Sequence, residues 1–458
     1  MYQERIAIVG GVAAGPAAAA QARRVNPSAD IWMFEAGANI SYGACEMPYV
    51  LSGLIETIDE LVVNTAAEFS RSRNINVRTG HRITAVHAAT RTLTIEDSAD
   101  GRTWDERFDK LVLATGARAR RLAVAGEDST GVFLFRTLDD LRQVTKMLNQ
   151  RPAKHAVVAG GGYVGVEVAE SLSKAGVRVS IVHRGSHILD SYVGSAHGEI
   201  IHNELSRHGV TVRKDSISRI EADATGHVKA VQTVGGELIG CDLVVVAVGV
   251  DPHSTLALDA GIRLGVSGGI RVDEHMRTSA SGIWACGDCI EVERIVDGAM
   301  IHSPLAPTAY RTARVAGSNA ARRGRGKPAR FHGVTPASAV KVFDLEVAAV
   351  GIRRNEAEAA GLDIVSNKIV AGSRAGMYPG SRDISIELVG MRRGGRLIGA
   401  ELVGGEGAAL RANVLALAIR QRLTVSQIKE VDLIYAPPFA PSIDPIIVAA
   451  RELEKLLI

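Results

Sequence analysis

Residues 5–15 have the sequence RIAIVGGVAAG, and this stretch decides the fold. A short apolar run leads directly into a glycine turn, and an alanine-rich segment follows through Arg24. A second apolar run covers residues 30–34 and ends at Glu35. This order predicts a βαβ unit, in which the helix N-terminus faces a pyrophosphate and Glu35 accepts a hydrogen bond from a ribose hydroxyl.

The glycine pattern of this first unit is incomplete, because Val12 stands where G-x-G-x-x-G has its second glycine. Such patterns discriminate loosely, so a strand–turn–helix without a ligand is the alternative interpretation. Residues 6–22 are also apolar enough to resemble a signal peptide. The preceding MYQER is not basic, however, and Pro16 interrupts the apolar run, so we expect no signal peptide here.

Residues 155–165, HAVVAGGGYVG, repeat the plan with all three glycines, Gly160, Gly162 and Gly165. A helical segment follows, and then a strand is expected over residues 177–182. Two such fingerprints in one chain are far more specific than either alone. The sequence therefore predicts two nucleotide-binding units.

The residues after this last strand bear on the choice of nucleotide. An acid at this position favours NAD, whereas the chain has His183 and Arg184. A pair of cations suits the additional 2′-phosphate of NADP. We therefore predict NADPH, with NADH possible, and the alternative interpretation is a solvated basic turn.

Composition sets further limits. At 458 residues the chain has room for about three domains of roughly 150 residues each. Its net charge of +3 gives no argument for a nucleic-acid partner, and no apolar run reaches the roughly 18 uncharged residues of a membrane span. Four cysteines do not form a disulfide framework in so long a chain, so we expect a cytoplasmic protein.

Two further segments complete the first unit, and a third domain follows. Residues 110–116 predict a strand that ends in a tight turn, and residues 283–288 repeat this plan with Asp288 at the end. A basic stretch at 320–328 marks a boundary, after which the last third, from residue 331, predicts an α+β domain. The predicted fold is α/β, with two Rossmann-like domains and a C-terminal α+β domain.

Cys45 stands alone in the sequence NISYGACEMPYVLSG, about ten residues after the second predicted strand. It is either an inert packed thiol or a redox nucleophile. Cys286 and Cys289 form a C-x-x-C pair, but a second pair is missing and Cys241 precedes a buried strand, so we expect no metal site. Cys286 and Cys289 are expected to serve packing.

With these pieces in order, the chain resembles the pyridine nucleotide–disulfide oxidoreductases along essentially its whole length. It is most similar to their single-cysteine branch, which includes coenzyme A-disulfide reductases, persulfide reductases, NADH oxidases and NADH peroxidases. The resemblance implies FAD bound by residues 1–120 and 255–325, and NAD(P)H bound by residues 121–254. It also implies a homodimer formed by residues 331–458, with active sites completed across the interface.

The resemblance carries roles onto individual residues. It implies that FAD is contacted by Gly10, Ala13, Gly15, Glu35, Thr115, Gly116, Asp288 and Ala306. It implies that NAD(P)H is contacted by Gly160, Gly162, Tyr163, Gly165, Glu167, His183 and Arg184. Tyr163 would be the aromatic gate at which nicotinamide docks, with Glu167 beside it.

Three positions favour a small disulfide or persulfide as substrate. Val50 stands where related reductases carry a second cysteine, so Cys45 would pair with an external sulfur in a mixed disulfide. Ala13 stands where the oxidases and peroxidases carry a histidine. Tyr435 and Tyr378 resemble tyrosines that the partner subunit brings to the thiol. We therefore expect Cys45, Tyr435 and Tyr378 to be catalytic.

The thiolate is the reactive form of Cys45, so we expect a helix start to lower its pKa from about 8.5, while Glu46 could oppose this. Gln21, Arg24 and Ser41 resemble the coenzyme A-binding residues of the reductases. The leading hypothesis is thus an NADPH-dependent flavoprotein that reduces coenzyme A disulfide or a persulfide. The alternatives are an NAD(P)H oxidase or peroxidase that cycles a cysteine sulfenic acid, and a flavin-bearing redox sensor without turnover.

Overall fold

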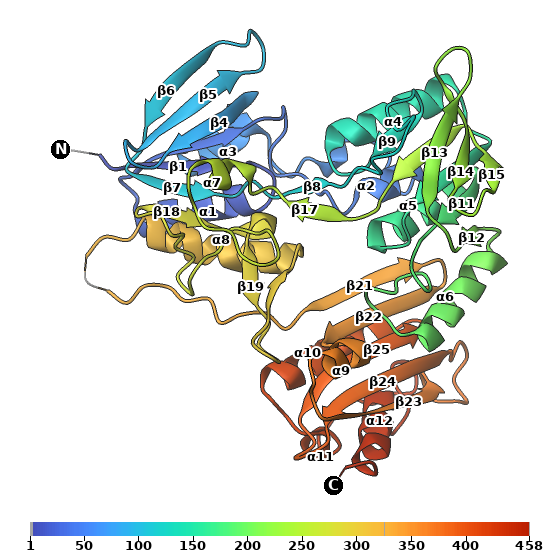
Figure 1. Ribbon diagram of the computed structural model, residues 1–458. Coiled ribbons are helices and arrows are strands. Elements are labelled where there is room, and N and C mark those ends of the chain that lie inside the picture. The colour runs from blue at the N-terminus through green and yellow to red at the C-terminus, as the bar shows by residue number, and fades with distance from the viewer. Residues whose placement is uncertain (1–2, 325, 458) are drawn as a thin grey trace.

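The computed structural model describes residues 3–324 and 326–457. Figure 1 shows two α/β regions in the upper half, the N-terminal one in blue and the central one in green, above a C-terminal domain in orange and red. The arrangement agrees with the predicted α/β class and its three structural regions.

A parallel sheet forms the centre of the N-terminal region, in the order β18 (Ile283–Ala285), β7 (Lys110–Leu113), β1 (Arg5–Val9), β2 (Asp30–Glu35) and β3 (Asn76–Thr79). Helices α1 (Ala14–Val25) and α8 (Ala306–Ala320) pack against each other beside it. Their close approach requires Gly317, where a Cβ atom would lie 2.3 Å from the carbonyl oxygen of Ala18. The distant segment 283–320 therefore completes the region that residues 5–35 begin.

The central region has a second parallel sheet, in the order β12 (Thr211–Arg213), β11 (Arg178–Val182), β10 (His155–Ala159), β16 (Leu243–Val246) and β9 (Val132–Leu134). Its helices are α4 (Leu138–Gln150), α5 (Tyr163–Lys174) and α6 (Ser195–Arg207). Every residue of β10 is buried, which explains its continuous apolar sequence. Strands β8 (Ala117–Ala119) and β17 (Val250–Pro252) pair antiparallel between the two upper regions.

The C-terminal domain contains an antiparallel sheet, in the order β21 (Ala337–Val342), β22 (Leu345–Gly351), β25 (Leu397–Gly404), β24 (Asp383–Met391) and β23 (Ile364–Gly372). Helices α10 (Ala408–Arg420) and α12 (Pro445–Glu454) pack on it. All eight residues of the central strand β25 are buried, so both faces of the sheet are covered. This is the α+β domain that the sequence predicts.

Smaller elements complete the chain. Additional strands are β4 (His81–His87), β5 (Thr92–Asp97), β6 (Thr103–Arg107), β13 (Ile217–Ala222), β14 (Val228–Thr233), β15 (Leu238–Gly240), β19 (Glu291–Glu293) and β20 (Met300–His302). Additional helices are α2 (Met47–Leu51), α3 (Ala66–Arg73), α7 (Thr255–Asp259), α9 (Arg354–Ala359) and α11 (Val425–Ile428), with 3₁₀ turns η1 (Asp59–Leu61) and η2 (Gly287–Cys289). Among the described residues, no helix has the length and apolar character to cross a membrane. The cytoplasmic location stays a prediction.

Candidate active site

The first glycine turn joins β1 to α1 with very little space. Gly10 has a φ of +110°, and a Cβ atom there would lie 2.1 Å from the carbonyl oxygen of Ala114. At Gly15 a Cβ atom would lie 1.7 Å from the carbonyl oxygen of Gly10. Only glycine fits both positions, so the turn stays tight and the N-terminus of α1 remains accessible to a phosphate. Ala13 is the N-cap residue of this helix.

Glu35 is fixed at this turn by two backbone groups. Its Oε2 accepts a hydrogen bond from the N–H of Gly11 at 2.6 Å, and its Oε1 accepts one from the N–H of Gly37 at 2.7 Å. A carboxylate has about four acceptor positions, so both oxygens can still accept from a ribose diol. The geometry suits the adenosine ribose of a dinucleotide.

The second turn has the same construction at β10 and α5. Gly160 has a φ of +112°, and a Cβ atom there would lie 2.3 Å from the carbonyl oxygen of Ala247. At Gly165 it would lie 2.1 Å from the carbonyl oxygen of Gly160. Gly162 differs, because no heavy atom of the described chain lies within 4 Å of its Cβ position. That open backbone leaves room for a pyrophosphate to approach.

His183 takes the place of the acid in the second unit. The N–H of Gly161 donates to its Nδ1 at 3.2 Å, which places the imidazole against the glycine turn. Its Nε2 lies 3.3 Å from Oδ1 of Asp190. Arg184 is exposed at the same turn, and the assignment of both residues to the 2′-phosphate stays a prediction.

Asp288 lies in η2 and pairs with a residue that the sequence analysis missed. Arg136 donates from Nη2 to Oδ2 of Asp288 at 2.9 Å and from Nε to the carbonyl oxygen of Ala117 at 3.3 Å. Arg136 directly precedes Thr137, the N-cap of α4. The only local signal for Arg136 in the sequence is its place before the capping box of α4. Its partner Asp288 is 152 residues away, so the sequence gives no sign of this ion pair.

The other predicted flavin contacts lie on neighbouring segments. Thr115 and Gly116 follow β7, where Thr115 Oγ1 donates to the carbonyl oxygen of His253 at 2.5 Å and Gly116 has a φ of +72°. Ala306 is the first residue of α8. Two tight glycine turns, the fixed carboxylate of Glu35 and the open backbone at Gly162 fit FAD on the first unit and NAD(P)H on the second.

The four cysteines fall into two kinds. Cys45 is exposed, whereas Cys241, Cys286 and Cys289 are buried. The Cys289 thiol donates to the carbonyl oxygen of Cys286 at 3.2 Å, and burial raises the pKa of both thiols. The burial of Cys286 and Cys289 agrees with the packing role predicted for them, and Cys45 is the exposed one of the four thiols.

The environment of Cys45 differs from the prediction. Desolvation raises the pKa of its thiol although the residue is exposed, and the carboxylates of Glu46 and Glu167 raise it further, while Arg136 lowers it. Helix α2 begins two residues after the thiol and has only five residues. The predicted lowering of the pKa by a helix start is therefore wrong for the groups of this chain.

Glu167 on α5 connects the nucleotide helix to the thiol segment. Tyr49 on α2, four residues after Cys45, donates to its Oε1 at 3.4 Å. Burial raises the pKa of Glu167 to about 7, and the charges of Glu170 and Glu46 act in the same direction. Glu167 can thus gain or lose a proton near neutral pH at the junction of α5 and the segment that carries Cys45.

Tyr163, the expected gate, makes two contacts that the sequence did not indicate. Its hydroxyl shares a hydrogen bond with the hydroxyl of Ser338 on β21, and its ring stacks on Tyr192 with centroids 3.7 Å apart. Burial raises the pKa of Tyr163 well above its usual range. The Tyr163 side chain is therefore held by the C-terminal domain and by the segment after β11.

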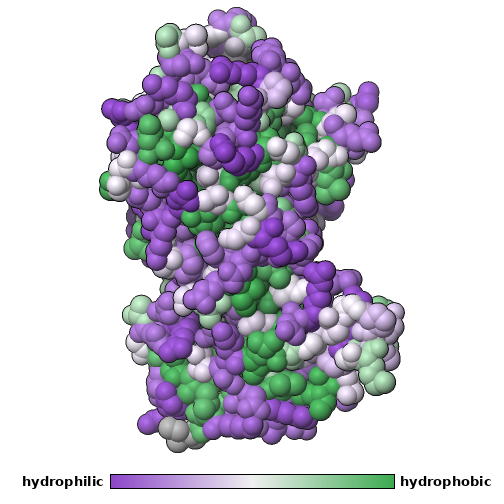
Figure 2. Space-filling view, turned by 90° about the vertical axis from the view of Figure 1, so that its right-hand side faces the viewer, coloured by the Kyte–Doolittle hydropathy of each residue, from purple (hydrophilic) through white to green (hydrophobic). Residues whose placement is uncertain are grey.

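Tyr378 and Tyr435 lie in the C-terminal domain and are 39% and 56% exposed. Other exposed apolar side chains of this domain are Val370, Met377, Leu410, Leu417, Ile434, Phe439 and Ile443. Figure 2 shows apolar side chains gathered on one face of this lower lobe. Both tyrosines are thus accessible to another subunit.

The residues assigned to coenzyme A lie on two segments of the N-terminal region. Gln21 donates to the hydroxyl of Ser318 at 2.9 Å, and Arg24 donates to Oε1 of Gln21 at 3.1 Å. Ser41 has a φ of +49°, and its N–H donates to the carbonyl oxygen of Gly11 at 2.9 Å. Gln21 is thus engaged in helix packing, whereas Ser41 adjoins the first glycine turn.

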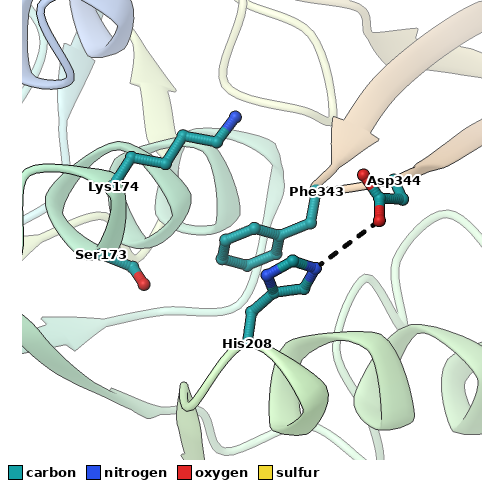
Figure 3. A pocket seen from close by; sticks show the side chains of 5 residues that line it. All are labelled: Ser173, Lys174, His208, Phe343 and Asp344. Atoms are coloured by element: carbon teal, nitrogen blue, oxygen red, sulfur yellow. Dashed lines mark ion pairs between the residues drawn. The ribbon is translucent and has the colours of Figure 1, made fainter.

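A pocket of about 240 Å³ lies apart from these residues, between α5, α6 and the turn joining β21 to β22 (Figure 3). His208 stacks on Phe343 there, with centroids 4.0 Å apart. Glu204, His208 and Asp344 place possible metal ligands within 4.8 Å of one another, but Arg207 donates to both carboxylates and compensates their charge.

A second group of possible ligands, His197, Glu387 and Glu401, joins α6 to the C-terminal sheet. Both ring nitrogens of His197 have partners, Glu401 at 3.0 Å and Ser385 at 2.9 Å. These hydrogen bonds engage both ring nitrogens of His197, so the arrangement does not require a metal ion. The group ties the central region to the C-terminal domain.

The sequence matches two protein families. Residues 4–320 match pyridine nucleotide-disulphide oxidoreductase, and residues 337–445 match the dimerisation domain of these enzymes. The chain is 32% identical over 454 residues to an NADH oxidase of Methanocaldococcus jannaschii, covering 99% of both chains. It is 32% identical to an NAD(P)H coenzyme A polysulfide/persulfide reductase of Pyrococcus horikoshii, again covering 99% of both. It is 30% identical to a coenzyme A disulfide reductase of Staphylococcus epidermidis, covering 95% of this chain and 96% of the relative.

Solved structures agree with these relatives. The reduced CoADR-RHD of Bacillus anthracis superposes with a TM-score of 0.95 at 30% identity, covering all of this chain and 81% of the other. An NAD-dependent persulfide reductase of A. fulgidus superposes with a TM-score of 0.94 at 33% identity, covering 98% and 83%. The family implies FAD and NAD(P)H as cofactors. The chain therefore belongs to the pyridine nucleotide-disulphide oxidoreductase family and is an oxidoreductase of that class.

Proposed function

We propose that this protein uses NAD(P)H to reduce a small disulfide or persulfide, with coenzyme A disulfide as the first candidate and Cys45 as the nucleophile. One observation carries the proposal: Cys45 is exposed, and its thiol lies within the electrostatic influence of charged residues from both nucleotide-binding regions, namely Glu167, Arg136 and Asp288. The names of two relatives, a coenzyme A polysulfide/persulfide reductase and a coenzyme A disulfide reductase, support it.

The proposed cycle is balanced in atoms and electrons. The thiolate of Cys45 attacks one sulfur of R–S–S–R, which forms Cys45–S–S–R and releases R–S⁻. Two electrons from NAD(P)H then cleave the mixed disulfide, release the second R–S⁻ and restore the thiolate. The sum is NAD(P)H + H⁺ + R–S–S–R → NAD(P)⁺ + 2 R–SH. FAD, when bound, supplies the two-electron carrier between nicotinamide and sulfur.

The chain's own residues prepare these steps. The Arg136 guanidinium favours the thiolate form of Cys45 against the opposing charges of Glu46 and Glu167. Tyr163 borders the docking position of nicotinamide, and its contacts with Ser338 and Tyr192 define where it rests. Glu167 can hold a proton near pH 7 at the same place.

We also propose a homodimer in which the partner supplies Tyr378 and Tyr435 to the thiol. Both side chains are accessible, and the matching dimerisation family supports this assembly. There they would protonate or orient the departing thiolate. Gln21, Arg24 and Ser41 are proposed to contact coenzyme A. We propose NADPH as the preferred nucleotide because Arg184 is exposed at the turn, and NADH as a second donor.

An NAD(P)H oxidase is the second candidate, because a relative of equal identity is named NADH oxidase. In that case Cys45 would cycle through a sulfenic acid. Ala13 argues against an oxidase, because it stands at the position where the oxidases and peroxidases carry a histidine.

The test measures NADPH consumption by the FAD-loaded protein with coenzyme A disulfide, with hydrogen peroxide and with oxygen alone. The proposal expects rapid consumption with the disulfide and release of two thiols per NADPH, which a thiol reagent counts. Rapid consumption with peroxide or oxygen alone would identify the oxidase. Consumption with none of them would contradict the proposal and favour a sensor.

A further inference from the structure

We propose that Asp190 is a specificity-determining residue of the second nucleotide site, where it supports the 2′-hydroxyl of NADH and opposes the 2′-phosphate of NADPH. This inference rests on the proposed function, because it concerns which nucleotide donates the electrons. It makes the pyridine-nucleotide preference a balance between Asp190 and Arg184, which carry opposite charges at one turn.

The first step is the equivalence of His183 and Glu35. Each side chain follows the second strand of its βαβ unit and accepts a hydrogen bond from the N–H of the second glycine of its turn, Gly161 or Gly11. The imidazole therefore occupies the place of the ribose-binding acid. Because its Nδ1 is an acceptor, a neutral His183 carries its proton on Nε2.

The second step concerns the Nε2 atom of His183. It is buried and has no hydrogen-bond partner within the described residues, although Oδ1 of Asp190 lies 3.3 Å away. The buried Nε2 is closed to a ligand, whereas the Asp190 side chain beside it is 25% exposed. A ribose hydroxyl can donate to this carboxylate. A phosphate dianion has no proton to donate, and the carboxylate repels it.

The chain between the two residues is built to bring them together. At Gly185 a Cβ atom would lie 1.9 Å from Oδ2 of Asp190 and 2.3 Å from Nε2 of His183. The N–H of Ser186 donates to Oδ2 at 3.2 Å. A side chain at position 185 would collide with both groups, so the glycine there allows the Asp190 carboxylate to lie against the His183 imidazole.

Asp190 is also anchored from outside its own region. Arg353, in the C-terminal domain just before α9, donates from its guanidinium to the backbone carbonyl oxygen of Asp190. Its other terminal nitrogen, Nη2, donates to Glu356 at 2.8 Å, so part of its charge is compensated. The backbone at residue 190 is thus held by a contact from the C-terminal domain.

An acid at the end of this strand favours NAD and an arginine nearby accommodates NADP. In this chain the strand-end residue is a histidine, and an acid seven residues later restores the missing acceptor. Arg184 acts in the opposite direction. The structure therefore assigns to this site an affinity for both nucleotides, with the ratio set by two side chains.

The experiment uses the FAD-loaded protein and compares Asp190→Asn with the parent. Calorimetry gives the Kd for NAD⁺ and for NADP⁺ without any disulfide. Asparagine keeps an oxygen for the N–H of Ser186, so the turn can retain its shape. We expect the ratio of Kd for NADP⁺ to Kd for NAD⁺ to fall about three- to fivefold, the range for a partly exposed charge interaction.

Two further variants make the result decisive. Arg184→Gln should shift the ratio in the opposite direction. Glu199→Gln removes an exposed carboxylate of α6 in the same region and should leave the ratio unchanged. An unchanged ratio in Asp190→Asn, or equal weakening of both nucleotides, would overturn the inference. Because no disulfide is present, a failure of the proposed reductase activity would leave this result readable.

Discussion

The two nucleotide-binding units of this chain have nearly the same turn and different surroundings. Gly10 and Gly160 adopt φ values of +110° and +112°, and each faces a carbonyl oxygen of the neighbouring strand. The residue that accepts from the turn is Glu35 in the first unit and His183 in the second. The backbone of the turn is thus common to both units, whereas the side chain at the strand end distinguishes their ligands.

The units also lead to different chemistry. The segment after the first unit carries Cys45, and the helix of the second unit begins with Tyr163 and continues to Glu167. Tyr49 joins them, because it follows the thiol and donates to Glu167 at 3.4 Å. In the proposed cycle, electron delivery and sulfur chemistry therefore meet where the two units touch.

The largest expected effect separates the roles of the two units. Cys45→Ser should abolish disulfide turnover, by at least about a thousandfold, because a serine hydroxyl cannot form the mixed disulfide. Binding of NADP⁺ and of FAD should be unchanged, since both glycine turns remain intact. Cys241→Ser, at a buried thiol, is the control and should retain turnover if it folds. Turnover by Cys45→Ser would show that another group is the nucleophile.

Two alanine substitutions test the common backbone. Gly160→Ala should lower stability by about 2 kcal/mol or more, because of its positive φ and the nearby oxygen of Ala247. Gly162→Ala should fold normally but weaken NADPH binding, since its methyl group projects into the open approach to the backbone. Thermal unfolding and calorimetry measure the two effects. Equal melting temperatures for both variants would contradict the comparison.

Glu167→Gln tests the contact between the units through pH. The pKa of Glu167 is raised to about 7 in the folded chain, so the folded state loses stability as pH rises from about 4.5 through 7. The variant lacks this loss and should gain roughly 1–3 kcal/mol relative to the parent between pH 5 and pH 8. Melting temperatures at both pH values measure it, with Glu199→Gln as control. A constant difference between variant and parent would exclude the raised pKa.

The smallest effect concerns the first unit alone. Glu46→Gln should lower the pKa of the Cys45 thiol, because it removes one of the charges that raise it. Alkylation of Cys45 by iodoacetamide at pH 7.5 should become roughly two- to fivefold faster, as for a partly screened charge pair. Glu56→Gln removes a nearby exposed charge and should leave the rate unchanged. A slower reaction in Glu46→Gln would reverse the assigned sign.

Much of the fold follows from local sequence. The strand over residues 30–35, the helix ending at Lys174 and the strand before Gly116 appear where they are predicted. Continuous apolar runs and the glycines of tight turns are local signals, so they can be recognised in the sequence alone. The burial of Cys286 and Cys289 also agrees with the packing role predicted for them.

What the sequence did not indicate depends on contacts between distant segments. Arg136 meets Asp288 across 152 residues, and Tyr163 meets Ser338 across 175. His183 is a further case, because its orientation depends on an N–H in the preceding turn. Such pairings are set by packing of whole elements and leave no periodic pattern in the chain.

The central claim is that one exposed sulfur takes its bonding partner from outside the chain. The direct measurement is the mass of the peptide containing Cys45 after the FAD-loaded protein meets coenzyme A disulfide without NAD(P)H. We predict a single coenzyme A adduct on Cys45 that disappears when NADPH is added, with no adduct on Cys286 or Cys289. An unmodified Cys45, or an adduct that NADPH leaves in place, would contradict the account.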